Sequence, residues 1–275
     1  GDVQLTRNLR AAALGRGNRL FNSKKYMDAA PAYRAAMAYD SAGTVTYLSR
    51  IAESYQLAAQ GMKDGAGKTA ALDSAAATYL EVVQKAGSDS LSMQAKESSM
   101  YNAAVIMVDL EKYPDAVKIL DEGMKQFPSS KDIFLLAGQT KFQTNDYDGS
   151  VKAMRQALEI DPKETTAHQF LFLALNKMGK KDESVAEYTV YRALDGGKRR
   201  TGPQLKTWVD SASNRLPPGQ QVTKTSSSEG YPEEIRTYTD GDKMLESWFY
   251  WTKGKSITFL DGQVFSQATF PPAKL

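Results

Sequence analysis

The first stretch whose residue types could carry out chemistry is a glycine-rich segment, GMKDGAGKT, at residues 61–69. It ends in Gly67, Lys68 and Thr69, and this combination of residue types holds the phosphates of nucleotides in phosphate-binding loops. That motif needs another glycine five residues before Gly67, where this sequence has Met62. It also needs to follow a strand, whereas the preceding residues predict a helix. We therefore interpret the segment as a loop between two helices.

A second candidate is the acidic run NDYDGS at residues 145–150, which resembles part of a calcium-binding loop. Thr144 stands where such a loop has its first carboxylate, and Arg155 stands where it has its closing glutamate. The run therefore predicts a solvated turn between helices.

Histidine and cysteine usage limits the remaining chemistry. The chain has one histidine, His168, and no cysteine, which excludes a Cys–His nucleophile pair and a histidine-rich metal site. One histidine is enough for a Ser–His–Asp catalytic arrangement, so the residue counts do not exclude one, but the sequence contains no nucleophile-elbow motif. We expect His168 to pack between helices, and we predict no catalytic residue, no cofactor and no metal site.

The elements that position these residues follow a repeat. Two patterns of the same residue types lie 34 residues apart: Tyr113, Ala116 and Pro128, then Tyr147, Ser150 and Pro162. This period, with a small residue in the second helix and a proline at the helix exit, resembles the tetratricopeptide repeat, a helix-turn-helix unit. The resemblance covers residues 10–198 and implies an all-α superhelix, or solenoid, in which each unit packs on its neighbours.

About five units fit the period. The clearest are the third and fourth, and the fifth departs from the pattern as the end of an array would. The first unit includes GNRLFNSKKYMDAAPAYRAAMAYD, and the third, fourth and fifth units span about 97–130, 131–164 and 165–198.

The second unit is degenerate, with helices near 45–60 and 69–86. Ala29 and Ala116 lie 87 residues apart, which is 19 more than two periods. We expect the loop GMKDGAGK and a longer connection, AGSDSLS at residues 86–92, to hold the extra residues.

Three further segments follow the array of residues 1–200. Apolar residues at helical spacing predict a capping helix at 201–216, ended by Pro217 and Pro218, and a Gly/Ser/Thr-rich composition predicts a linker at 217–234. Alternating apolar residues predict a small antiparallel β-meander of four strands at 235–275, with Asp261-Gly262 as a hairpin turn. Alternation places Trp248 and Tyr250 on one face of their strand, and Phe249 and Trp251 on the other.

The resemblance also implies a binding surface, because tetratricopeptide units present certain first-helix positions in a concave groove. Amides there suit the backbone of a bound peptide, and aromatic groups suit its anchors. Some members of the family hold a C-terminal carboxylate with paired lysines and asparagines on the first two units. Asn18 and Asn22 match the asparagines of this clamp, but Leu14, Ser49 and Gln56 stand at the remaining clamp positions, so the clamp is not matched. Carried over position by position, the groove residues are Asn18, Phe21, Asn22, Glu53, Tyr101, Val105, Gln139, Phe142, Gln169, Leu173, Asn176 and Lys177.

The charge of the chain and its first residue indicate what kind of partner it binds and where in the cell it is located. The net charge of +3 argues against nucleic-acid binding, and no apolar run is long enough to span a membrane. Residues 1–50 carry eight Lys or Arg and three Asp, a local charge of +5, which suits a solvated helix face or an acidic partner or membrane surface. Because the chain starts at Gly1, we expect a removed export signal and a periplasmic or extracellular location in a bacterium, with a cytoplasmic location as the alternative.

Together these features predict a non-enzymatic scaffold that binds a protein or peptide in the concave groove. One alternative is a cell-envelope ligand or polymer held by the β-module, with Trp248, Tyr250, Trp251 and Phe259 as a stacking platform. Another is an enzyme with a site between the array and the sheet.

Overall fold

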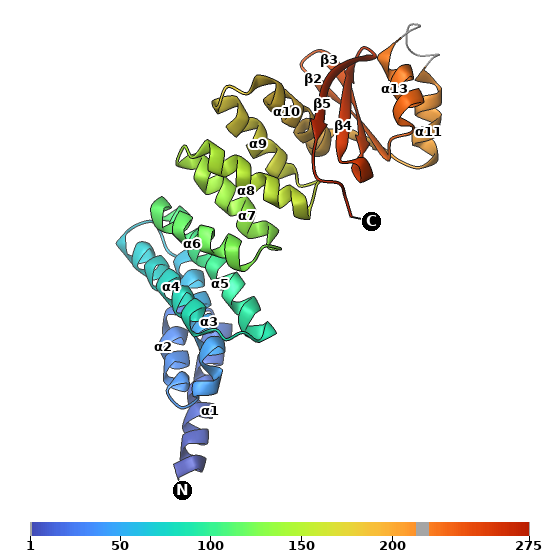
Figure 1. Ribbon diagram of the computed structural model, residues 1–275. Coiled ribbons are helices and arrows are strands. Elements are labelled where there is room, and N and C mark those ends of the chain that lie inside the picture. Colours follow the sequence, from blue (N-terminus) through green and yellow to red (C-terminus); the bar gives the residue numbers. More distant parts are fainter. Residues whose placement is uncertain (1, 213–219, 275) are drawn as a thin grey trace. The chain divides into compact units, whose positions relative to one another are not determined.

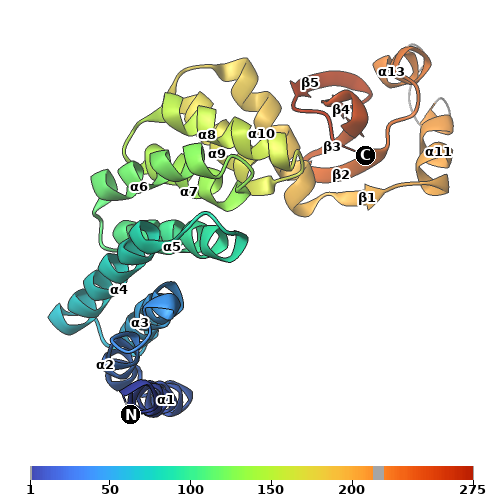
Figure 2. The ribbon, with the colours of Figure 1, turned by 60° about the horizontal axis from the view of Figure 1, so that its bottom comes forward.

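The computed structural model describes residues 2–212 and 220–274. The chain divides into two compact parts, Gly1–Pro128 and Ser129–Leu275, which we call the N-terminal module and the C-terminal module. Helix pairs build both parts, and the C-terminal module also contains a sheet (Figures 1 and 2).

The N-terminal module consists of three helix pairs, which correspond to the first three predicted units. In order they are α1 (Asp2–Asn22) with α2 (Tyr26–Met37), the 3-10 helix η1 (Ser41–Gly43), α3 (Thr44–Gln60) with α4 (Ala66–Lys85), and α5 (Ser90–Asp109) with α6 (Tyr113–Gln126). One boundary differs, because α5 begins inside the segment AGSDSLS that we expected to be a connection. The Asp89 side chain accepts a hydrogen bond from the backbone N–H of Ser92, at 3.0 Å, and so caps an earlier helix start.

Small residues lie where the two helices of a pair cross, as the repeat predicts. A Cβ added to Gly17 of α1 would lie 2.8 Å from the ring of Tyr33 in α2. Ala104 and Ala116 are fully buried at the corresponding positions of the third pair. Larger side chains at these positions would push the helices apart, at a cost of about 1–3 kcal/mol.

The turn inside a pair is nearly the same each time. Lys24, Glu111, Asn145 and Gly179 have positive φ angles of 58°, 57°, 62° and 75°, in the left-handed region. In each turn this residue and the next donate backbone hydrogen bonds to carbonyls three and five residues earlier, as Glu111 and Lys112 do to Val108 and Met107. The second pair has the longer loop 61–65 instead, in keeping with its degenerate sequence.

The first four helices of the C-terminal module form the fourth and fifth pairs. They are α7 (Lys131–Gln143) with α8 (Tyr147–Ile160), and α9 (Thr165–Lys177) with α10 (Lys181–Gly196). In the fifth pair Phe172 occupies the usual small position, and its ring packs on Tyr188 with 5.0 Å between the centroids. Ser184 of α10 donates its hydroxyl hydrogen to the carbonyl of Phe172 at 3.1 Å, so the two helices still approach each other closely at this position.

A five-stranded antiparallel sheet follows α10. Its strands are β1 (Lys198–Arg200), β2 (Glu234–Asp240), β3 (Lys243–Tyr250), β4 (Lys255–Leu260) and β5 (Gln263–Thr269), in the order β1-β2-β3-β4-β5, with the 3-10 helix η2 (Trp251–Lys253) between β3 and β4. The predicted meander is confirmed for β2 to β5, including the turn at Asp261 and Gly262, which both have positive φ. The short strand β1 was missed, because three basic residues carry no strand pattern of their own.

Two helices lie where we predicted a cap and a linker. Helix α11 (Pro203–Asp210) packs on the sheet and not on the end of the array, and α13 (Gln221–Glu229) lies inside the predicted linker. Serine and threonine hydroxyls of α13 bond to carbonyls of its own preceding turn, which does not stabilise a helix. The helix forms despite its linker-like composition because Val222 packs in the core beside the sheet. The predicted helix end at Pro217 and Pro218 lies outside the described residues.

The two faces of the sheet have different cover, as Figures 1 and 2 both show. Phe249 and Trp251 face α10, whereas Trp248 and Tyr250 face α11 and α13, which confirms the predicted alternation. The sheet itself therefore covers the last helix of the array. The residues that α10 contributes to this core are Ala186, Val190 and Ala193.

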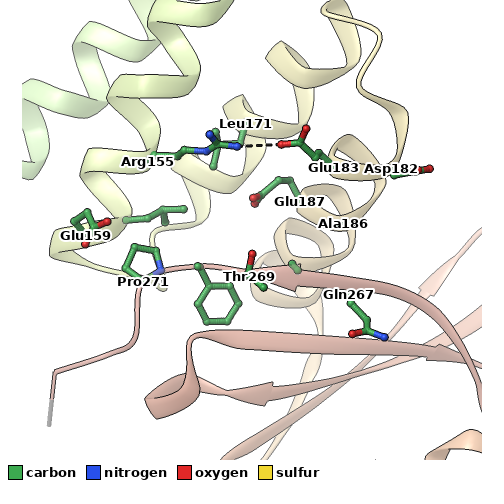
Figure 3. Close-up of a pocket in the computed structure, with 13 residues that line it drawn as sticks. Arg155, Glu159, Leu171, Asp182, Glu183, Ala186, Glu187, Gln267, Thr269 and Pro271 are labelled. Carbon is green, nitrogen blue, oxygen red and sulfur yellow. Dashed lines mark hydrogen bonds and ion pairs between the residues drawn. The ribbon is translucent and has the colours of Figure 1, made fainter.

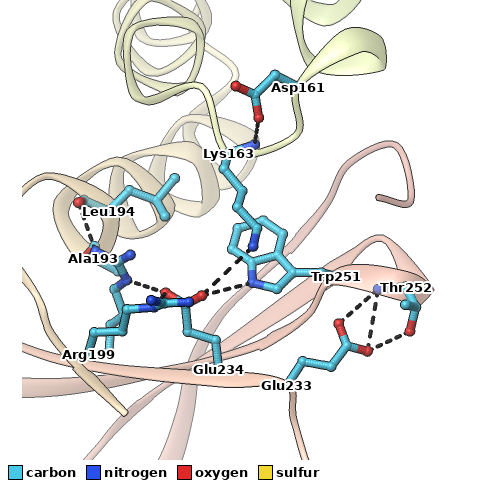
Figure 4. A network of polar contacts seen from close by, with 10 residues as sticks. Asp161, Lys163, Ala193, Leu194, Arg199, Glu233, Glu234, Trp251 and Thr252 are labelled. Carbon is cyan, nitrogen blue, oxygen red and sulfur yellow. Dashed lines mark hydrogen bonds and ion pairs between the residues drawn. The ribbon is translucent and has the colours of Figure 1, made fainter. Parts of the chain in front are cut away.

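A buried carboxylate ties the sheet to the helices (Figure 4). Glu234 of β2 is 2% exposed, and its Oε1 lies 2.5 Å from Nε of Arg236 and 3.2 Å from Nε of Arg199. Its Oε2 accepts from Nε1 of Trp251 at 3.3 Å and lies 4.0 Å from Nζ of Lys163, in the loop between α8 and α9. Burial acts to raise the pKa of Glu234, but the hydrogen bond and charge of Arg236, with Arg199, outweigh it and lower that pKa.

Arg236 extends this network to the end of α10. Its Nη1 donates to the carbonyl of Leu194 at 3.0 Å, one of the last carbonyls of that helix. A cation at a helix C-terminus is favourable, because the unpaired carbonyls carry partial negative charge. Glu234 and Arg236 together thus fix β2 against α10.

Candidate protein-interaction surfaces

The N-terminal module contains a groove of about 550 Å³ between α3 and α5, which we call the α3–α5 groove. From α3 it is lined by Ser49, Glu53 and Gln56, the three positions that the family register assigns to the concave side of the second unit. The remaining lining residues are Leu57, Gln60, Tyr79, Leu91, Gln94, Ala95, Ser98, Ser99 and Asn102. Glu53 is the one charged group among them, so the groove is polar and nearly neutral.

Hydrogen bonds hold the polar groups of α3 in place. Tyr79 donates its hydroxyl hydrogen to Oε1 of Gln56 at 2.7 Å, and Arg50 lies 2.9 Å from Glu53. Burial, assisted by the negative charge of Glu53, raises the pKa of Tyr79 to about 12. Tyr79 is therefore a neutral hydrogen-bond donor that orients the amide of Gln56.

The α5 side of this groove differs from the sequence expectation. Gln94, Ser98 and Asn102 line it, in place of the predicted Tyr101 and Val105, which are half-buried on the same helix. Gln94 lies in the early turns of α5 that precede the 34-residue register, and Ser98 and Asn102 follow it at four-residue spacing on the same face of the helix. The N-cap residue Asp89 was the sequence signal for this extension.

The α1 residues of the predicted groove mostly serve the first helix pair. Asn18 accepts from the hydroxyl of Tyr33 at 3.0 Å, and Phe21 packs edge-on against Tyr26 with 5.2 Å between the ring centroids. Arg50 lies over the ring of Phe21 at 5.4 Å. Asn22, also of the predicted set, is exposed.

The predicted groove residues of the C-terminal module lie on α7 and α9. Phe142 packs against Phe170 and Tyr147, with centroid distances of 5.6 and 5.5 Å, and so belongs to the packing between helices. Asn176 and Lys177 are exposed near the end of α9, while Gln139, Gln169 and Leu173 are half-buried. Their positions are compatible with a surface role, which stays a prediction.

The predicted stacking platform is wrong, because its aromatic side chains are buried. Trp248, Tyr250, Trp251 and Phe259 are 0%, 1%, 4% and 2% exposed. Tyr250 donates its hydroxyl hydrogen to the carbonyl of Gly230 at 3.1 Å. Alternation identified the two faces of the strand correctly, but helices on both sides cover them.

The other chemical candidates have structural roles. Lys68 of the glycine-rich segment lies 2.7 Å from Asp64, in the loop between α3 and α4. Asp146 of the acidic run accepts from the backbone N–H of Gly149 at 2.9 Å and caps α8. His168 is fully buried, with Nδ1 2.6 Å from Glu187 and Nε2 3.1 Å from the carbonyl of Pro162, so its predicted packing role is confirmed.

Two further features of residues 2–212 and 220–274 concern membranes and metals. No helix there combines the length and the apolar character needed to cross a bilayer. Within the same residues, no three His, Asp or Glu side chains lie close enough together to hold a metal ion.

A second groove, of about 520 Å³, lies in the C-terminal module between β5 and the helices α8 and α10 (Figure 3). We call it the β5 groove. Its charged lining is mostly acidic, with Glu183 held 3.0 Å from Arg155 and Glu187 held by His168. Two carboxylates here are thus already paired. The charged residues that line the groove are Arg155, Glu159, Asp182, Glu183 and Glu187.

Comparisons with known proteins agree with the helical fold. The family model "Tetratricopeptide repeat" matches residues 132–164, which form the fourth helix pair. Among curated proteins, none matches this sequence.

Similar solved structures include two crystal structures of MamA. One has a TM-score of 0.54 and 15% identity, covering 68% of this chain and 92% of MamA, and the other has a TM-score of 0.52 and 16% identity, covering 65% and 94%. The structure of YrrB, described as a TPR protein with an unusual peptide-binding site, has a TM-score of 0.50 and 12% identity, covering 66% of this chain and 84% of YrrB. At such identities the likeness concerns the fold. The helical array of this chain therefore has the fold of tetratricopeptide repeat proteins, and its fourth helix pair matches the sequence model of that family.

Proposed function

We propose that the protein is a non-enzymatic scaffold that binds an extended segment of another protein in the α3–α5 groove. The observation that carries this proposal is the lining of that groove, where amides and hydroxyls of two neighbouring first helices converge around a concave space of about 550 Å³. A space of this size lies within the range of ligand-binding pockets, about 300–1,000 Å³.

The chemistry of the lining favours a peptide over a small charged ligand. Gln56, Gln94 and Asn102 each offer a donor and an acceptor, which matches the alternating N–H and C=O groups of a peptide backbone. One carboxylate in the groove gives little charge to attract an ionic ligand. The description of YrrB, a structurally similar protein, as having a peptide-binding site supports the same class of partner.

Apolar contact would come from two leucines at the rim. Leu91 is 79% exposed, and Leu57 beside it is half-buried. Full burial of one leucine side chain is worth about 1.5–3 kcal/mol, so Leu91 is the strongest single anchor that the groove provides. We expect the partner to place an apolar side chain against it.

The test is selection of peptides from a random displayed library on the intact protein, followed by calorimetry with the best binder. Gln94→Lys places a longer charged side chain in the groove, and we expect it to weaken binding at least tenfold. Gln84→Lys is the matched control, because Gln84 is exposed on α4 and does not line the groove. If Gln94→Lys binds every selected peptide as tightly as Gln84→Lys does, the α3–α5 groove is not the binding site.

A further inference from the structure

The outer edge of β5 is open along its second half. Phe270 donates its backbone N–H to the carbonyl of Gly254 at 2.9 Å, which turns the main chain of Phe270 toward β4. Because main-chain direction alternates along a strand, Ala268 also faces β4, whereas Gln267 and Thr269 direct their N–H and C=O groups outward. Within the described part of the chain, these outward groups of Gln267 and Thr269 have no hydrogen-bond partner.

The first half of the same edge is protected. Oε1 of Gln221, at the start of α13, accepts from the backbone N–H of Val264 at 2.5 Å, and Gln220 bonds to the side chain of Gln263. Edge strands commonly carry a charge or a proline that blocks pairing with another chain. The strand Gln263–Thr269, QVFSQAT, has neither. The side chains of Gln220 and Gln221 therefore cover the edge of β5 only at Gln263 and Val264, and the β5 groove begins at Gln267.

The open edge lies along the β5 groove. Figure 3 shows β5, with Gln267 and Thr269, on one side, and α10, with Glu183 and Glu187, on the other. Four carboxylates and one guanidinium line the groove, which gives a net charge of 1 − 4 = −3. Ala186, Ala268 and Phe270 supply apolar surface beside the strand. The groove thus joins unpaired strand hydrogen-bonding groups to an acidic wall.

We propose that the β5 groove binds an extended basic segment of a partner protein, which pairs with β5 as an added strand and directs Lys or Arg side chains toward α8 and α10. Main-chain bonds to Gln267 and Thr269 supply the pairing, and the carboxylates select the charge. Glu159 and Asp182 form no ion pair within the described residues and are the first to meet an incoming cation.

A second copy of this chain fits the groove less well. Edge-to-edge pairing of two β5 strands would bring together two walls of charge −3, and like charges across an interface are unfavourable. The strand β5 also contains no Lys or Arg to neutralise the opposite wall. We therefore assign the basic segment to another protein, with pairing by a second copy as an outcome of the test. This surface lies in the C-terminal module and is independent of the α3–α5 groove.

The first experiment measures binding of two synthetic peptides to the intact protein by fluorescence polarisation. One repeats Thr-Lys-Val-Lys, and the other repeats Thr-Glu-Val-Glu with the same length and strand propensity. We expect the basic peptide to bind and the acidic one not to bind. Equal binding of both peptides, or of neither, would overturn the proposal.

Two variants then separate strand pairing from charge. Gln267→Pro removes an outward N–H without removing a bond to β4, and we expect at least a tenfold loss of affinity. Asp182→Lys reverses an exposed charge in the groove, whereas Asp195→Lys makes the same change elsewhere on α10 and is the control. Unchanged binding by Asp182→Lys refutes the charge selection, and this variant stays informative if Gln267→Pro fails to fold.

Hydrogen exchange locates the contact directly. In the presence of the basic peptide we expect amide exchange at Gln267 and Thr269 to slow at least tenfold, with little change at Ala268, which already faces β4. Protection confined to the N-terminal module would place the peptide elsewhere and overturn the proposal. So would dimerisation of the free protein that Gln267→Pro abolishes, because the edge would then be occupied by a second copy.

Discussion

Replacing Glu234 by glutamine tests whether one buried carboxylate holds the sheet against the helices. The change keeps the size of the side chain and removes its charge. Arg199, Arg236 and Lys163 then lose the group that neutralises them. We expect a large loss of stability in the C-terminal module and none in the N-terminal module.

The magnitude follows from the exposure of each cation. Removing one member of a buried ion pair costs about 3–5 kcal/mol when its partner stays buried, and a hydrogen bond to a charged group contributes about 1.5–3 kcal/mol. The side chains of Arg199 and Lys163 are 57% and 46% exposed, so water solvates them once the carboxylate is gone. Arg236, at 19%, stays poorly hydrated. We therefore expect a loss of about 2–3 kcal/mol, near the lower end of these ranges.

The pH dependence provides a second signature. The pKa of Glu234 is lowered in the folded state, so its carboxylate contributes stability above the pKa of an unfolded glutamate, about 4.3. That contribution is lost as the pH falls through the lowered pKa of the folded state. Glutamine does not titrate. The difference between the wild type and Glu234→Gln should therefore be full at neutral pH and shrink in acid.

The assay uses the distribution of tryptophan in the chain. All three tryptophans, at positions 208, 248 and 251, lie in the C-terminal module. Urea unfolding followed by tryptophan fluorescence therefore reports on that module alone. Glu159→Gln is the control, because Glu159 is exposed and the same charge is removed. A loss below about 0.5 kcal/mol, as expected for a surface substitution, would refute the structural role of Glu234, as would a difference that persists in acid.

Three further predictions concern backbone strain and a buried phenol. Glu111→Gly relieves a left-handed residue and should stabilise the N-terminal module by about 1 kcal/mol in thermal unfolding followed by circular dichroism; no gain would argue against strain at this turn. Gly254→Ala should cost about 3 kcal/mol by tryptophan fluorescence, since φ is 63° and a Cβ would lie 2.3 Å from the carbonyl oxygen of Phe270. Because burial raises the pKa of Tyr79 to about 12, the stability it contributes is present below about pH 10 and is lost as the pH rises through 12. Tyr79→Phe should lower stability by about 1 kcal/mol at neutral pH, where the bond to Gln56 is lost, and should reduce the alkaline loss; an unchanged alkaline profile would contradict this cause.

Periodicity made the array predictable. The third and fourth helix pairs bury small residues at the same two crossing positions, so Ala104 and Ala116, or Gly138 and Ser150, identify these pairs from sequence alone. Alternation likewise assigned Trp248 and Phe249 to opposite faces of β3. Both rules depend on local spacing, and both were confirmed.

What the sequence did not predict depends on contacts between distant residues. Helix α13 is stabilised by Val222, which packs in the same core as Trp248, and a polar sequence gives no sign of that contact. Strand β1 pairs with β2, where Arg199 lies opposite Arg236 and its side chain reaches Glu234. In the α3–α5 groove the lining includes Glu53, whereas the α5 wall is formed by Gln94, Ser98 and Asn102 and not by Tyr101 and Val105. A role of these residues in binding stays a prediction.

The recurring left-handed turn has a consequence for how such a chain can change in evolution. Glu111, Asn145 and Gly179 follow one another at intervals of 34 residues and share one hydrogen-bond pattern. A duplication or deletion that begins and ends at equivalent points of this turn would leave every turn between paired helices intact. Whole 34-residue units can therefore be gained or lost without disturbing the turns. An insertion of any other length has to be absorbed inside a pair. This chain has 19 additional residues between the second helices of its first and third pairs, in the region that contains the different loop 61–65 and the early start of α5.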